Sequence, residues 1–416
     1  MGRRKKQPNG PIQAEQQKRK GDSRLPESFP AELLQQSTGA RQAYFEHCLI
    51  EHTHLQEACS AVVRAICMPG NDGVYRRLDS MVLVIGPSRV GKTTLIHLLE
   101  QELLLRAQDR MQADPGYIPY VSITMDGAGA GRFDWRDYYQ PVLRQLSDPF
   151  LPVKKPARSA RDLQEAMEEA LAFRKTGVVI VDEAQHLAKA SSGRRLQDRL
   201  DHLKHFENKT GVSHVLVGTY EMRPFRKVNA QLACRSIDVH FPRYDATNEV
   251  ECTTFQSVLW ALQRQLPVEC EPQLLQNHWE FLYARSLGCI GLLKQHLNEA
   301  LRLALDEGAK TITLDHLRKT ALHKEKVDLA LEAILKGEQD FAEAEDADQD
   351  LLIKLGMAPA RSPAEKENPG VDEKQGVQPH SPRRQKRQPG ERRSGRDSIG
   401  SEPIQQPSDE ANQAVG

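Results

Sequence analysis

The sequence lacks the long apolar run that a membrane-spanning helix requires. No stretch of about 18 consecutive apolar residues occurs in the 416-residue chain, so no membrane span is expected. The first residues, MGRRKKQPNG, contain no apolar core of the kind found in a secretory signal peptide. We therefore expect a cytoplasmic protein that makes no contact with a membrane.

Closely spaced cysteines are also missing. The chain has 7 cysteines, and no two of them form a C-x-x-C pair. Their odd number and wide spacing argue against a disulfide framework and against a zinc site. We expect each to be a small buried side chain in a reducing compartment. They are Cys48, Cys59, Cys67, Cys234, Cys252, Cys270 and Cys289.

The chain has no net charge, because 57 Lys and Arg residues balance 57 Asp and Glu residues. The charges are nevertheless unevenly distributed. Residues 1–24 and 379–400 are basic and polar, whereas 338–350 are strongly acidic. Such compositions cannot bury a core, so we predict disordered tails over 1–35 and 338–416. The basic runs are either solvated or attracted to nucleic-acid phosphates, and the acidic-to-basic C-terminal tail is a candidate docking segment for a partner.

Short apolar segments alternate with helical patterns in the first two thirds of the chain. This alternation predicts an α/β domain over 36–245, with a parallel five-stranded sheet and helices on both faces. The domain includes an N-terminal helical segment, 41–66. Only helical patterns follow, which predicts a helical lid subdomain over 246–337. The expected strands are 81–85, 120–125, 177–183, 214–219 and 237–242.

A phosphate-binding loop follows the first expected strand. The segment GPSRVGKT fits G-x-x-x-x-G-K-[ST], and a helix begins at its end. The glycines permit a tight turn whose backbone amides face phosphate, and the helix start adds positive potential. Lys92 would contact the β- and γ-phosphates of ATP, and Thr93 would bind Mg²⁺. The expected nucleotide-binding residues here are Gly86, Pro87, Ser88, Arg89, Val90, Gly91, Lys92, Thr93 and Thr94.

Two acids end the expected strand 177–183. Beside a phosphate-binding loop, Asp182 is predicted to hold Mg²⁺ and Glu183 to act as general base toward the attacking water. The alternative is an ordinary strand end that exposes two acids. Thr219 ends a later strand that could lie between the first strand and the acidic one. Its hydroxyl would orient the water, or would merely cap the chain.

Together the loop, the acidic pair, Thr219 and the helical lid resemble an AAA+ ATPase. The resemblance implies an oligomer in which each site is completed by a neighbour's arginine. Arg235, before the fifth expected strand, matches that position best; the alternative is a surface salt bridge. Lys294 lies where the class carries a second sensor, which is commonly arginine. Lysine cannot present a planar fork, so this departure weakens the assignment.

Longer segments are similar to TniB and TnsC, ATPases of DNA transposition, and more distantly to MuB of phage Mu. The resemblance covers roughly residues 40–335 and implies a bacterial regulator that assembles with ATP on duplex DNA. It also implies that the assembly links a target-selection protein to a transposase and comes apart on hydrolysis. When DNA-bound, such a protein would be associated with the nucleoid. The segments are 43–62, 84–95, 192–225, 231–244 and 285–297.

Two loops that carry cations are candidate contacts to duplex DNA. One spans 126–139 and the other spans 189–197, and cations on such loops neutralise phosphates without reading sequence. The alternative is solvated loop charge, and Trp135 fits packing better than base stacking. Two other functions stay open: a helicase loader or origin-binding initiator, and a signalling or secretion ATPase that acts on protein. The candidate DNA-binding residues are Arg132, Lys189, Arg194 and Arg195.

Overall fold

The structure, a computed structural model, divides into two units, Met1–Ala344 and Glu345–Gly416. All elements discussed below belong to the first unit. The structure describes residues 28–66, 81–125, 133–147, 159–187, 193–226 and 236–341, with 352, 354, 355 and 357. Among the helices described there, none is both long enough and apolar enough to cross a membrane.

A five-stranded parallel sheet has the order β2-β3-β4-β1-β5. This confirms the predicted sheet, and β4 does lie between β1 and β3. Because all strands are parallel, their carboxyl ends meet at one edge, where ligands bind in open α/β sheets. The strands are β1 Met81–Ile85, β2 Tyr120–Thr124, β3 Val178–Asp182, β4 Ser213–Gly218 and β5 Ser236–His240.

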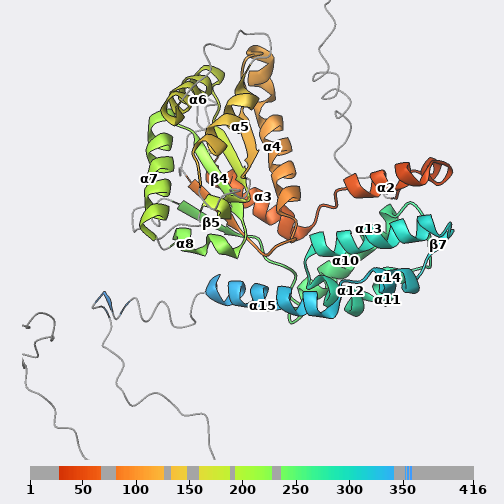
Figure 1. Cartoon of the computed structure of the whole chain (residues 1–416). Coiled ribbons are helices and arrows are strands. Elements are labelled where there is room, and N and C mark those ends of the chain that lie inside the picture. The colour runs from red at the N-terminus through yellow and green to blue at the C-terminus, as the bar shows by residue number, and fades with distance from the viewer. Residues whose placement is uncertain are drawn as a thin grey trace, which may run out of the picture. The chain divides into compact units, whose positions relative to one another are not determined.

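Helices cover both faces of this sheet (Figure 1). One apolar cluster joins Val82 and Val84 of β1 to α3 and α4, and another joins Leu83 and Ile85 to α5, α6 and α7. Strands buried on both faces explain why the sequence is apolar throughout rather than alternating. The helices are α3 Thr53–Ile66, α4 Lys92–Ala113, α5 Arg136–Leu146, α6 Ala160–Arg174 and α7 Gly193–Thr210.

The N-terminal helical segment is broken where one continuous pattern was expected. Helix α2 covers Thr38–His47, α3 starts at Thr53, and the residues between them are not helical. The ammonium of Lys294 donates hydrogen bonds to the main-chain carbonyls of Glu46 (2.8 Å) and Cys48 (2.5 Å). These carbonyls at the end of α2 therefore accept hydrogen bonds from a side chain of the lid, as helix C-terminal carbonyls commonly do from lysine.

The lid has its own apolar core, which includes Phe255, Leu259 and Leu293. Phe45 of α2 is part of that core, although α2 precedes the first strand of the sheet in sequence. Within the helical patterns of the lid, residues 274–288 and 314–337 each contain two helices. The lid elements are α10 Glu249–Gln265, β6 Glu269–Cys270, α11 Leu274–Asn277, α12 Trp279–Ser286, α13 Ile290–Asp306, β7 Thr311–Ile312 and α14 Leu314–Thr320.

Helix α15, Lys324–Phe341, connects the lid to the α/β domain. Arg243, in the segment after β5, forms an ion pair with Glu338 through two nitrogen–oxygen contacts of 2.9 and 3.1 Å. Phe341 stacks on His240 with ring centroids 4.3 Å apart. These contacts place the end of α15 against the carboxyl ends of the strands, where Thr219 also lies. The remaining short elements are η1 Ala31–Gln35, η2 Ala184–Leu187, η3 Tyr220–Met222 and α8 Arg223–Arg226.

Replacing Gly337 by Ala should displace α15. A Cβ at this position would lie 2.1 Å from the ring of Tyr220. Overpacking of this kind costs about 1–3 kcal/mol, more than the roughly 1 kcal/mol that Ala gains over Gly in a helix. We expect a lower melting temperature by calorimetry. Gly39→Ala is the control, because nothing lies within 4 Å of its added Cβ, and it should not destabilise. Equal melting temperatures for both variants would contradict the described packing of α15.

Candidate nucleotide-binding site

The loop between β1 and α4 has the backbone geometry of an anion-binding turn. Gly91 has φ 120° and ends the loop, and Arg89 has φ 61°, in the left-handed region. Helix α4 begins at Lys92, so its first amides and the positive end of its dipole face the loop. The loop thus has a turn of backbone amides at the carboxyl end of β1, as the sequence pattern predicts.

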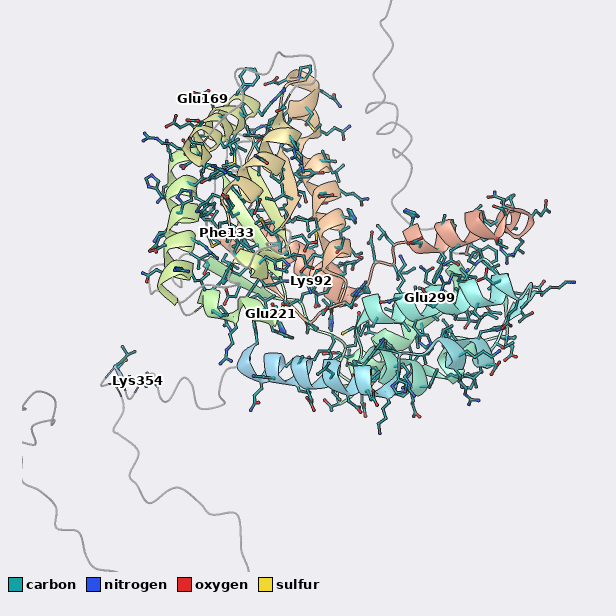
Figure 2. All side chains as sticks on the ribbon, in the orientation of Figure 1. Lys92, Phe133, Glu169, Glu221, Glu299 and Lys354 are labelled. Carbon is teal, nitrogen blue, oxygen red and sulfur yellow. The ribbon has the colours of Figure 1, made fainter. Side chains whose placement is uncertain are left out.

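Lys92 is a buried cation at the start of α4 (Figure 2), with 7% of its surface exposed. Its ammonium donates a hydrogen bond of 2.7 Å to the carbonyl of Pro87. Burial lowers the pKa of Lys92, while the nearby carboxylates of Glu183 and Asp182 act in the opposite direction. No carboxylate of the described residues forms a salt bridge with it. A desolvated ammonium without a paired anion fits an anionic ligand such as a polyphosphate.

Asp182 and Glu183 lie at the end of β3, opposite the loop. Burial raises the pKa of Asp182, so a cation beside it would favour its charged form. Its Oδ1 accepts a hydrogen bond of 2.8 Å from the amide of Glu183. Glu183 has φ 53°, a conformation that costs a non-glycine residue about 1–2 kcal/mol. Such strain concentrates at functional sites, which supports a role for this turn.

Thr219 follows β4 and therefore lies between the loop and the acidic pair. Its hydroxyl accepts a hydrogen bond of 3.4 Å from the amide of Glu221 and caps η3. Its own amide donates a hydrogen bond of 3.3 Å to Oε1 of Gln185. Sequence reasoning did not select Gln185. Only its position two residues after Glu183 was visible in the sequence; that it is buried is seen only in the structure.

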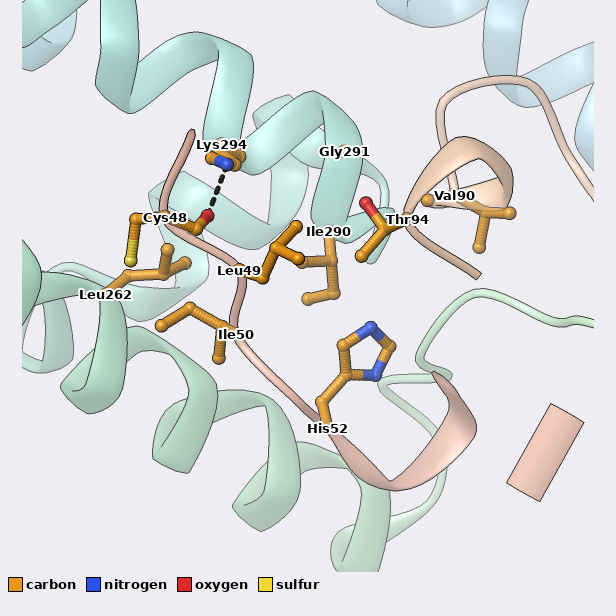
Figure 3. A pocket seen from close by; sticks show the side chains of 11 residues that line it. Cys48, Leu49, Ile50, His52, Val90, Thr94, Leu262, Ile290, Gly291 and Lys294 are labelled. Carbon is orange, nitrogen blue, oxygen red and sulfur yellow. Dashed lines mark hydrogen bonds between the residues drawn. The ribbon is translucent and has the colours of Figure 1, made fainter. Parts of the chain in front are cut away.

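Beside the loop is a pocket built from three parts of the chain (Figure 3). Leu49 and Ile50 come from the break between α2 and α3, and Ile290 comes from the lid. Burial lowers the pKa of His52 to about 4, so its imidazole is neutral near pH 7. Most of the side chains that line the pocket are apolar. Its lining is Cys48, Leu49, Ile50, His52, Val90, Gly91, Thr94, Leu262, Ile290, Gly291 and Lys294.

The lid contacts the phosphate-binding loop directly. The amide of Leu292, in the first turn of α13, donates a hydrogen bond of 3.2 Å to the carbonyl of Arg89. Lys294, the expected second sensor, lines the same pocket, and its ammonium binds the carbonyls of Glu46 and Cys48. In this structure Lys294 therefore joins the lid to the N-terminal segment.

The structure describes few of the predicted arginine-finger and DNA-binding residues. Arg132, Lys189 and Arg235 lie outside the described residues, as does the side chain of Arg194. Arg195 is exposed in the first turn of α7. Trp135 lies against the main apolar core, with its ring centroid 4.3 Å from that of His202, so it is a packing residue.

Gly291→Ala should weaken nucleotide binding by separating the lid from the loop. Its Cβ would lie 2.3 Å from the carbonyl oxygen of Arg89, so α13 or the loop must move and the pocket loses a wall. We expect the Kd of a fluorescent ATP analogue to rise about tenfold, which corresponds to about 1.4 kcal/mol. Gly39→Ala serves again as the control. An unchanged Kd in Gly291→Ala would show that the described lid position is not the one that binds nucleotide.

Comparison with known proteins gives a family match for part of the chain. Residues 76–226 match a family model described as an AAA domain. The ORC2 protein of Aeropyrum pernix in its ADPNP–ADP complexes is 14% identical, with a TM-score of 0.48 over 69% of this chain and 74% of that chain. For CDC6P of Pyrobaculum aerophilum the identity is 14% and the TM-score 0.47, over 67% and 70%. For Drosophila ORC bound to DNA, the identity is 14% and the TM-score is 0.43, over 83% of this chain and 92% of that chain.

The matched segment contains the loop, the acidic pair and Thr219, which lie at the ends of three adjacent strands of the parallel sheet. The chain has the AAA+ P-loop fold, with an AAA domain over residues 76–226.

Proposed function

We propose that this chain binds and hydrolyses ATP at the edge formed by β1, β3 and β4. The observation that carries the proposal is the buried ammonium of Lys92, which forms no salt bridge with any described residue and is close enough to Asp182 and Glu183 for their charges to affect its pKa. An ammonium inside the loop would bind the β- and γ-phosphates. The loop amides and the start of α4 would stabilise the charge that the phosphates carry.

The residues at the strand ends would complete hydrolysis. Glu183 would accept a proton from the attacking water, and Thr219 would orient that water. The hydroxyl of Thr93 and the carboxylate of Asp182 would hold Mg²⁺. Their oxygen donors suit this ion. The described part of the chain has no group of three His, Cys, Asp or Glu residues that could hold a metal, so the phosphates of ATP would have to supply further ligands. When bound, Mg²⁺ supplies charge neutralisation on the phosphates.

The pocket beside the loop is suited to the adenine and ribose of ATP. Leu49, Ile50 and Ile290 would contact the faces of the base, and neutral His52 is a hydrogen-bonding group that carries no charge near pH 7. The ligand would then contact the loop, the lid and the N-terminal segment together. Nucleotide binding would therefore fix the position of the lid.

We further propose that ATP binding assembles this protein on duplex DNA and that hydrolysis releases it. The resemblance of 192–225 and 285–297 to transposition ATPases supports this proposal. The assembly would recruit a transposase to a site marked by a target-selection protein. Arg235 would reach the γ-phosphate in the neighbouring subunit, where its cation would stabilise the transition state.

Glu183→Gln should trap the ATP-bound state. The amide cannot accept the proton, so we expect hydrolysis to fall at least about 10²-fold with little change in the Kd for ATP. Assemblies on duplex DNA should then persist, as followed by light scattering after ATP addition. Hydrolysis at the wild-type rate would contradict the role of Glu183. Assembly that is equally short-lived in both proteins would contradict release by hydrolysis.

Changing Arg194 and Arg195 together to Ala should weaken duplex binding uniformly across sequences. Each phosphate contact contributes about 0.9 to the slope of log K against log salt, so we expect that slope to decrease by about 1.8. The measurement is fluorescence anisotropy at several salt concentrations with a non-hydrolysed ATP analogue. Arg161→Ala is the control, because its side chain is 86% exposed on α6, far in sequence from both loops.

The nucleotide affinity of the Arg194 and Arg195 variant should remain at the wild-type value. Equal salt slopes for wild type and variant would remove these arginines from the interface. If duplex DNA does not bind at all and does not stimulate ATP hydrolysis, the alternative of a protein-directed ATPase is favoured.

A further inference from the structure

Gln185 joins the ends of two adjacent strands through one side chain. It lies in η2, two residues after Glu183, and is buried. Its amide nitrogen donates a hydrogen bond to Oε2 of Glu183, and its amide oxygen accepts one from the backbone amide of Thr219. The end of β3 and the end of β4 are therefore connected by a neutral group that donates and accepts at once.

The amide of Gln185 has little freedom to move. A Cβ on Gly218 would lie 2.5 Å from Oε1 of Gln185 and 2.3 Å from the sulfur of Met222. Gly218 is the last residue of β4, so the absence of a side chain there leaves the space that the amide occupies. Close packing at this point restricts the rotation of the Gln185 amide.

A hydrogen bond to one carboxylate oxygen leaves the other available for a second partner. Glu183 is half-buried and lies on a backbone turn with positive φ, so two constraints act on it: its main chain and Gln185. Catalytic groups must be held close to their productive geometry, and a displacement of about 1 Å can cost about 10²-fold in rate.

We infer that Gln185 is a positioning residue for the hydrolysis of ATP. It holds the carboxylate of Glu183 at a fixed position relative to Thr219. The inference rests on the proposed function, because it requires Glu183 to act on the attacking water. Gln185 acts through Glu183, so its effect should vanish when the base is absent.

A double-mutant cycle tests this inference in the full chain. Gln185→Ala should lower kcat about 10- to 100-fold while the KM for ATP stays within about twofold. In the Glu183→Gln background the same change should cause no further loss, because residues that act as a unit are not additive. Gln185→Glu keeps the acceptor toward Thr219 but loses the donor toward Glu183, and it should lower kcat at least as much.

Gln164→Ala is the matched control. Gln164 donates a 2.9 Å hydrogen bond to Glu168 within α6. The substitution therefore removes the same type of hydrogen bond at a place away from the strand ends. The kcat of this variant should equal that of the wild type. Melting temperatures show that each variant is folded, and Gln185→Glu serves if Gln185→Ala does not fold. A rise in KM with unchanged kcat, or an equal loss in both backgrounds, would overturn the role of Gln185. Absence of ATP hydrolysis by the wild-type protein would instead overturn the proposed function itself.

Discussion

One buried ammonium group sets the requirement on which the site depends. Lys92 is almost fully removed from water, its pKa is lowered by that burial, and its 2.7 Å contact is to a main-chain carbonyl rather than to a carboxylate. A desolvated charge is costly unless an opposite charge meets it. The helix start at Lys92 adds further positive potential. An anionic ligand at this edge of the sheet would satisfy the charge of Lys92 and the potential of the helix start, close to the acids at the end of β3.

The lid and the N-terminal segment take part in the same arrangement. Leu292 binds the loop carbonyl of Arg89, and Lys294 binds carbonyls in the segment that lines the pocket. Helix α15 makes a second connection through the ion pair of Arg243 with Glu338. A ligand in the pocket would contact three parts of one chain, so binding energy can be used to fix their relative positions. This is the physical basis on which ATP could control assembly.

Much of the α/β domain could be predicted from the sequence, because its signals are local. The five apolar runs became the five strands, and the segment between 81–85 and the next helix became a loop with the backbone geometry of an anion-binding turn. The placement of β4 between β1 and β3 was also anticipated. Leu196, Leu200 and Phe206, which recur in the sequence at helical spacing, are all buried on α7.

The features that the sequence did not predict depend on contacts between distant residues. At the break after α2, the carbonyl of Cys48 binds Lys294, which lies more than 240 positions away in sequence. Gln185 gains its role from Thr219, on a strand that only the fold makes adjacent. The contact of Gly337 with Tyr220 has no local signature either. Periodicity records which face of an element is buried, but not which partner buries it.

Assembly in the presence of duplex DNA tests the central claim most directly. Purified protein would be mixed with long duplex DNA and either a slowly hydrolysed ATP analogue or ADP, then imaged by negative-stain electron microscopy. The account predicts regular rings or filaments along the DNA with the ATP analogue and separate subunits with ADP. Separate subunits under both conditions would contradict it.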